Sequence, residues 1–243
     1  RALAPVLPDD LARDLARLNA LSELGRADRT LPFKVFNAKV KDAVGNWIAR
    51  DVFYDTLSGE TTRHIDCVLL HVRKNRRRSV YVEGVGTHVL CRSMDAAEGV
   101  TEEGEVLDCE SCPHKEWQGR AKPQCSLIYT FLGLDREQGG NPFLIRAKHT
   151  SLLPAKKYLA RHFEGRLKTP EGAADLPLFV CKTKLTLTMP TGNYAVLAFE
   201  NGGVCTEAEI REHLRVFTLF RSIIKGPKAP EPPAGVAEAA EPA

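Results

Sequence analysis

Four cysteines in the middle third of the chain have the residue type, and part of the spacing, of a zinc site. Cys109 and Cys112 form a Cys-x-x-Cys pair, which can place two thiolates on one tetrahedral ion from a single tight turn. Cys91 precedes this pair and Cys125 follows it, and each of them adjoins an apolar segment that can anchor it. Four cysteinates leave no open coordination position for catalysis. The sequence therefore predicts one structural Zn²⁺ ion held by these four cysteines.

Two histidines near the cysteines leave the ligand set open. His88 stands three residues before Cys91 and His114 stands two residues after Cys112, so either histidine could replace one cysteine. Seven cysteines without a signal-like apolar N-terminus indicate a reducing compartment, where metal binding is more common than disulfides. The remaining three lie in apolar segments and are predicted to be core residues: Cys67, Cys181 and Cys205.

The densest run of charge, at 73–78, has five cations in six positions and is predicted to be a loop between two strands. Cations mixed with aromatic rings suit single-stranded nucleic acid, because cations neutralise phosphates while rings stack on unpaired bases. Neither contact reads the base sequence, so the predicted binding is general. The candidate nucleic-acid-binding residues are Lys34, Lys39, Trp47, Tyr54, Arg73, Lys74, Arg76, Arg77, Arg78, Tyr81, Trp117, Arg146, Lys148, Lys156 and Lys157.

The alternation of apolar and polar residues predicts a mainly β fold of the α+β class. Residues 88–125 carry little regular pattern, as expected where a metal replaces a core. A last helix is predicted to begin at Thr206, because Thr206 and Glu209 have the spacing of a capping box. The other predicted helices are 9–24 and 151–163, and the predicted strands are 33–41, 47–54, 63–73, 79–82, 126–134, 142–148, 178–189 and 194–199.

The chain of 243 residues is long enough for one large domain with its own core. Its net charge of +3 says little about partners, and no segment approaches the roughly 20 apolar residues of a membrane helix. We expect no membrane association and a cytoplasmic location. The predicted units are an N-terminal helical extension at 1–31, a nucleic-acid-binding domain at 32–225 with a zinc subdomain at about 88–125, and a disordered Pro/Ala/Glu tail at 226–243.

The sequence lacks the motifs of the common enzyme classes. It has no Walker loop, no nucleophile elbow, no zinc-protease motif and no dinucleotide-binding glycine fingerprint. His64 and Asp66 share a predicted strand face, but a lone pair of this kind is more often structural. The acids that a magnesium-dependent nuclease would cluster fall mostly at 98–110 and in the helices. We therefore expect a binding protein and not an enzyme.

Three stretches of sequence carry a family resemblance. They are Cys91-Arg-Ser-Met-Asp95, then Cys109-Glu-Ser-Cys-Pro113 with Trp117 and Cys125 after it, then Pro142-Phe-Leu-Ile-Arg146 through Thr150 and Ser151. In this order they resemble the single-stranded DNA-binding proteins of tailed bacteriophages and mobile elements. The resemblance implies an OB-fold-like antiparallel barrel with a zinc-binding excursion and flanking helices, which coats single strands in DNA replication or recombination.

The same resemblance implies an acidic C-terminal tail that recruits replication or recombination proteins. The tail of this chain departs from that pattern, since after residue 226 it has only Glu231, Glu238 and Glu241 against Lys228. In a phage-encoded protein the expected location is the cytoplasm of the bacterial host.

The expected function is therefore sequence-independent binding of single-stranded DNA. The sequence does not distinguish DNA from RNA, because contacts to the 2′-hydroxyl leave no readable pattern. The alternative is a zinc-ribbon adaptor that binds a protein of a replication, recombination or transcription complex and has little affinity for nucleic acid. A duplex-reading protein would need a recognition helix, and the basic helix predicted at 151–163 has no helix-turn-helix partner before it.

Overall fold

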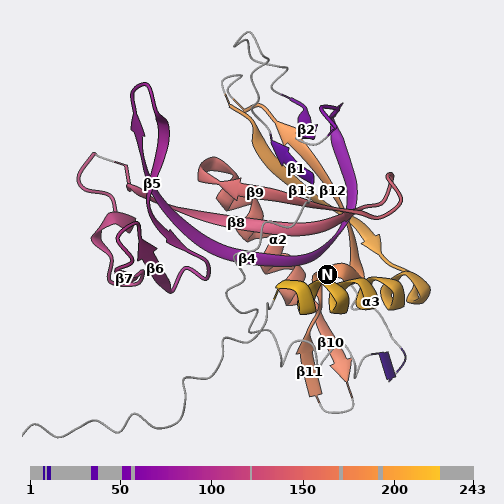
Figure 1. Ribbon diagram of the computed structural model, residues 1–243. Helices are drawn as coiled ribbons and strands as arrows, with labels where there is room; N and C mark the ends of the chain where they lie inside the picture. The colour runs from indigo at the N-terminus through magenta and orange to yellow at the C-terminus, as the bar shows by residue number, and fades with distance from the viewer. Residues whose placement is uncertain are drawn as a thin grey trace, which may run out of the picture.

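The computed structural model describes residues 8, 10–11, 34–37, 51–55, 58–120, 122–169, 172–190 and 194–224. It consists of a body, in which helices flank a large sheet, and a ribbon of two long strands that carries a smaller lobe away from the body (Figure 1). The predicted tail at 226–243 lies outside the described residues. So does most of the predicted helix at 9–24, of which Asp10 and Leu11 are described as helical.

The body and the ribbon contain two α-helices, two 3-10 turns and ten strands within the described residues. The helices are α2 (Leu152–Glu164) and α3 (Glu207–Ile224), with 3-10 turns η2 (His149–Ser151) and η3 (Leu178–Val180). The strands are β1 (Lys34–Asn37), β2 (Phe53–Asp55), β3 (Thr61–Thr62), β4 (His64–Val82), β8 (Cys125–Asp135), β9 (Asn141–Lys148), β12 (Cys181–Thr188) and β13 (Val196–Val204), with a separate two-stranded sheet of β10 (Arg166–Thr169) and β11 (Gly172–Asp175).

The main sheet confirms a mainly β fold with helices. Its strand order is β3-β2-β1-β9-β8-β4-β5-β6-β7, and β12 joins it by pairing with both β4 and β13. All of its pairings are antiparallel except that of β1 with β9. Within the described residues β3 and β13 are not paired with each other, so these pairings alone do not show closure into a barrel.

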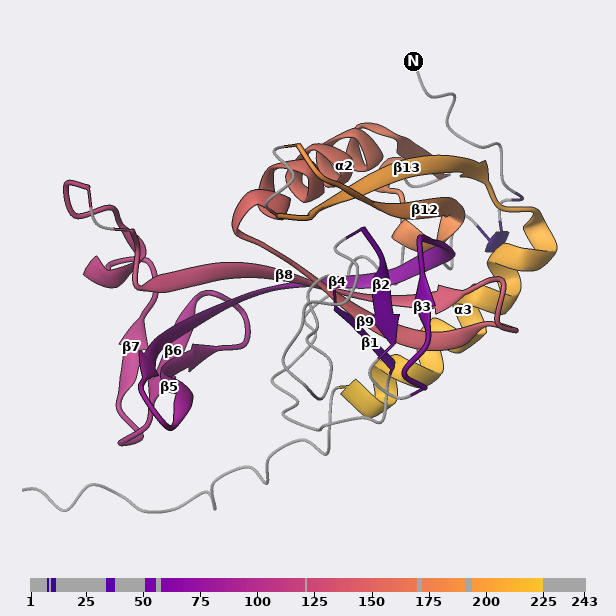
Figure 2. The ribbon, with the colours of Figure 1, turned by 90° about the horizontal axis from the view of Figure 1, so that it is seen from above.

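The long strand β4 connects the body with the far end of the ribbon. It runs unbroken for 19 residues, and one of its edges pairs with β8 from Cys67 to Arg78. Its other edge pairs with β12 near the body and with β5 at the far end (Figure 2). The loop predicted at 73–78 is therefore wrong. A run of like charges has the composition of a solvated loop, but ladder hydrogen bonds from β8 and β5 hold these residues in a strand.

The distal lobe, residues 86–124, is also more regular than its sequence predicts. It holds β5 (Gly86–Ser93), β6 (Glu98–Thr101) and β7 (Val106–Asp108), which form consecutive antiparallel pairs, and the 3-10 turn η1 (Pro113–Lys115). The prediction of little regular structure failed because these strands bury no apolar face. The alternation by which strands are recognised in sequence is therefore missing.

Two apolar clusters lie on opposite faces of the body sheet. One contains Val68, Leu132 and Phe179 and is packed against α3, while the other contains Leu69, Phe143 and Leu159, the last of these from α2. Within the described residues neither cluster includes any member from 73–127. The three cysteines predicted to be core residues are all buried: Cys67, Cys181 and Cys205.

Local signals in the second half of the chain predicted its elements well. The helix α2 falls where the pattern placed it, and β12 and β13 form the predicted antiparallel pair. The bounds of the strands differ, since 178–180 form η3 and β13 continues to Val204, and residues 191–193 lie outside the described residues. At the start of α3 the Glu209 backbone N–H donates to Thr206 Oγ1 at 3.3 Å. In return the Thr206 backbone N–H donates to Glu209 Oε2 at 2.7 Å, which confirms the capping box.

The substitution Gly133→Ala is expected to destabilise the body. A Cβ at Gly133 would lie 2.6 Å from Phe143 Cζ and 3.3 Å from Leu69 Cδ2, and both side chains are fully buried. Neither side chain has space to retreat, so we expect a loss of about 1–3 kcal/mol in the free energy of unfolding. Urea unfolding of the two proteins measures this change, and an unchanged midpoint would contradict the close packing of β8 on β9.

Candidate metal pocket and nucleic-acid surface

Strand alternation divides the cations of the 73–78 run between the two faces of the ribbon. Arg73 lies opposite Thr130, and Thr130 lies opposite Arg146, so these three residues form one row across β4, β8 and β9. Arg77 shares this face and lies opposite Arg92 of β5. We call this surface the arginine face and define it by five cations: Arg73, Arg77, Arg92, Arg146 and Lys148.

The arginine face concentrates positive charge on adjacent strands. Within the described part of the chain, no ion pair is found for Arg77, Arg92 or Arg146. Burial and the charge of Arg77 lower the pKa of the Arg146 guanidinium. Like charges held together in this way favour a bound anion, because an anion relieves their mutual repulsion.

The opposite face of the ribbon leads into a pocket that contains all four predicted zinc ligands. Cys125 begins β8, Cys91 lies on β5, Cys109 follows β7 and Cys112 precedes η1. We call this the cysteine pocket, and its lining is Arg76, Arg78, Cys91, Ser93, Leu107, Cys109, Cys112, His114, Lys115 and Cys125.

The four thiols of the cysteine pocket influence one another. Burial raises the pKa of the Cys91 thiol, and Cys109, Cys125 and Cys112 raise it further. Burial also raises the pKa of the Cys125 thiol, while a hydrogen bond from Arg76 opposes that rise. A Cβ added to Gly99 would lie 2.8 Å from Cys91 Sγ and 3.5 Å from Cys109 Sγ, so both sulfurs border the same glycine.

The sulfurs are more widely spaced than a bound zinc ion requires. Tetrahedral Zn–S bonds of about 2.3 Å bring the ligand atoms close to one another. Among the residues described here, the three-residue group whose possible ligand atoms all lie within 4.8 Å of one another is His64, Asp66 and Glu137, and it contains no cysteine. Cysteine sulfur and histidine nitrogen are donor types that fit zinc. Zinc binding in the cysteine pocket therefore stays a proposal.

The two histidines left open by the sequence have different surroundings. His88 Nε2 lies 2.8 Å from Glu102 Oε2, and His88 does not line the cysteine pocket. His114 does line the pocket, and its buried Nδ1 has no hydrogen-bond partner. A buried ring nitrogen normally has a partner. Of the two histidines, His114 is therefore placed to act as a fifth donor.

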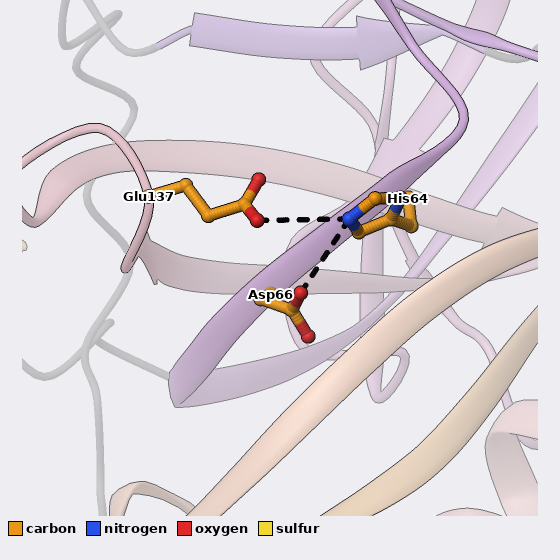
Figure 3. Close-up of side chains that lie close together, drawn as sticks. All are labelled: His64, Asp66 and Glu137. Carbon is orange, nitrogen blue, oxygen red and sulfur yellow. Dashed lines mark ion pairs between the residues drawn. The ribbon is translucent and has the colours of Figure 1, made fainter.

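The sequence placed His64 and Asp66 on one strand face but missed Glu137, which completes a group of three. His64 and Asp66 share a face of β4, and Glu137 reaches them from the turn after β8 (Figure 3). His64 Nε2 lies 3.5 Å from Asp66 Oδ2 and 3.6 Å from Glu137 Oε1. All three side chains are at least a third exposed. Contacts of one surface histidine nitrogen with two carboxylates account for the group.

The remaining candidate nucleic-acid residues do not gather on one surface. Lys156 and Lys157 lie exposed on α2, whose Ala155 packs with Ala147 of β9. Arg146 and Lys148 alternate with Ala147, so α2 covers the face opposite to them. Tyr81 is 78% exposed at the end of β4 and Trp117 is 63% exposed in the distal lobe.

Five further candidates have weaker placements or lie outside the described residues. Lys34 lies in β1 and Tyr54 in β2, both on the side of the sheet that ends at β3. Lys74 lies on β4, on the face opposite to Arg73. Lys39 and Trp47 lie outside the described residues.

Comparison with known proteins identifies no relative. No family model, no curated protein and no solved structure matches the chain. Neither described helix combines the length and the apolar character needed to cross a membrane.

Proposed function

We propose that the protein binds single-stranded DNA, with little sequence preference, on the arginine face. The observation that carries this proposal is the row structure of that face, in which cations of β4, β5 and β9 lie across adjacent strands. The three central positions of β8 in these rows are small or aliphatic, namely Ser126, Ile128 and Thr130. Ile128 and Thr130 are buried, whereas Arg92, Arg146 and Lys148 are exposed, so the cations form the accessible part of these rows.

The energetics of such a surface come mainly from the phosphates. Each neutralised phosphate of a single strand releases counterions, and log K falls with log salt by about 0.7 per contact. Five contacts give a slope of about −3.5, which corresponds to a loss of about 100-fold in affinity between about 50 mM and about 200 mM salt. Preference for single strands needs base stacking as well, and the exposed rings of Tyr81 and Trp117 are suited to it.

A single structural Zn²⁺ ion in the cysteine pocket is part of the proposal. Four thiols and the unpartnered His114 Nδ1 supply the donors that zinc prefers, and these donors come from separate segments of the distal lobe and from the start of β8. The bound ion would cross-link these segments and would have no catalytic role. The proposal also includes the OB-fold-like barrel and the role in replication or recombination that the family resemblance implies.

Titration of labelled oligo-dT, and of a duplex of the same length, at about 50 mM and about 200 mM salt tests the proposed function. We expect tighter binding of the single strand and a salt slope near −3.5. Equal or stronger binding of the duplex would refute the preference for single strands. The absence of binding to either would refute nucleic-acid binding itself.

The same titration tests the adaptor alternative, which one observation favours. The distal lobe and the tip of β4 expose several valines, of which Val85 is 78% and Val106 is 63% exposed. Exposed apolar side chains gathered on one small lobe are typical of a surface that contacts protein. An adaptor would bind neither oligonucleotide.

A further inference from the structure

The basic run of β4 contains residues of two kinds, and their surroundings differ. Arg73 and Arg77 belong to the arginine face, whereas Arg76 and Arg78 alternate with them and line the cysteine pocket. Arg78 lies opposite both Cys91 of β5 and Cys125 of β8, so it stands between two of the thiols. Arg76 lies opposite Ser93 and hydrogen-bonds to Cys125.

The cations of the pocket match the charge that a loaded site would carry. Four thiolates around one divalent ion leave two net negative charges in a partly buried place, which costs free energy unless positive charge lies nearby. Two guanidinium groups supply that charge, and each can donate hydrogen bonds to sulfur. The third cation of the lining, Lys115, donates to the backbone carbonyl oxygen of Glu110.

A second contact fixes the position of one guanidinium. Arg78 Nε donates to Gln124 Oε1 at 3.2 Å, and Gln124 directly precedes Cys125. This hydrogen bond holds Arg78 beside the residue that precedes Cys125. Within the described residues, Arg77 has no comparable link to the cysteine segments.

We propose that Arg76 and Arg78 are positioning residues of the cysteine pocket, where they orient the thiolates and balance their charge, and that they do not contact nucleic acid. This inference rests on the proposed zinc ion and on the proposed strand-binding arginine face. Strand alternation would give the residues of one basic run two different roles. One set of alternate residues faces the phosphates and the other set supports the metal ligands.

Arg76→Gln and Arg77→Gln form a matched pair for the test, because they remove the same charge from adjacent positions on opposite faces. Metal affinity is measured by competition with a chelator, using Zn²⁺ and Co²⁺, whose absorption reports thiolate ligation. We expect Arg76→Gln to lower metal affinity about 10- to 100-fold, as loss of an outer-shell partner typically does. We expect its affinity for oligo-dT to stay within about twofold of the wild-type value.

Arg77→Gln is expected to do the reverse, with unchanged metal affinity and weaker binding of oligo-dT. The conservative variant Arg76→Lys keeps the charge and should recover most of the metal affinity, which a merely structural defect would not predict. If both glutamine variants change metal affinity alike, or both change oligo-dT affinity alike, the division is refuted.

The two underlying proposals fail in distinguishable ways. A wild-type protein that takes up neither Zn²⁺ nor Co²⁺ overturns this inference together with the proposed metal. A wild-type protein that binds metal but not oligo-dT overturns the proposed function alone. In that case the loss of metal affinity in Arg76→Gln would still support the role of Arg76 in the pocket.

Discussion

Removal of metal from the cysteine pocket is expected to unfold the distal lobe and leave the body folded. The lobe lacks a described apolar core of its own, since neither buried cluster includes a residue from 73–127. Val100 and Val106 of the lobe are exposed, and its buried side chains are those of Ser93 and Cys109. Structural zinc contributes on the order of 10 kcal/mol to the folding of comparable metal-dependent units. Without that contribution the lobe has little else to hold its strands together.

Backbone hydrogen exchange measured peptide by peptide, with and without a chelator, tests this expectation. Peptides from residues 86–124 should lose protection when metal is removed, while peptides from 126–148 and 181–188 should keep it. Cys112→Ser should reproduce the effect without chelator. Glu110→Gln alters an exposed neighbour of the same turn and is the matched control. Unchanged protection of the lobe after metal removal would show that something other than metal holds it.

Loss of two cations from the arginine face is expected to weaken binding of oligo-dT by at least about 100-fold at low salt. The double substitution Arg77→Gln with Arg146→Gln removes two groups close enough for one to lower the pKa of the other. Each charged hydrogen bond to a phosphate contributes about 1.5–3 kcal/mol. The salt slope should also become shallower by about 1.4, because two fewer counterion-releasing contacts are made.

The matched control for this variant is Lys156→Gln with Lys157→Gln, which removes the same charge from the exposed side of α2. Because α2 covers the face opposite to Arg146, the control should leave both affinity and salt slope nearly unchanged. The Arg77 and Arg146 variant should fold at least as stably as the wild-type protein, since relief of like-charge repulsion opposes unfolding. An equal effect of the two double variants would show that the strand does not follow the arginine face.

The elements that sequence patterns predicted correctly are those determined by local chemistry. The capping box of α3 depends on two residues three apart, and β12 carries a clear alternation of buried and exposed positions. Both signals lie within one short segment, so they do not depend on what the rest of the chain does.

The features that could not be predicted depend on strand register. The run at 73–78 is a strand only because β5 and β8 pair with it, and its division between two faces follows from that pairing. Glu137 meets His64 because β4 and β8 align so that Arg136 N–H reaches the Asp66 carbonyl oxygen at 2.9 Å. The composition of a segment does not indicate how its strand aligns with its neighbours. Without that alignment, the fifteen candidate nucleic-acid-binding residues could not be assigned to one face of the sheet or the other.

The pairing of Asn75 with Ile128 has an evolutionary consequence. At this point the chain leaves the body along β4 and returns along β8, and the two positions stand side by side. The 52 residues between them, 76–127, therefore have the topology of an insertion at the end of a β-hairpin. Such a unit can be gained, lost or exchanged between lineages while the register of the remaining sheet stays the same. We expect distant relatives with a similar body to vary most in the length and cysteine content of this segment.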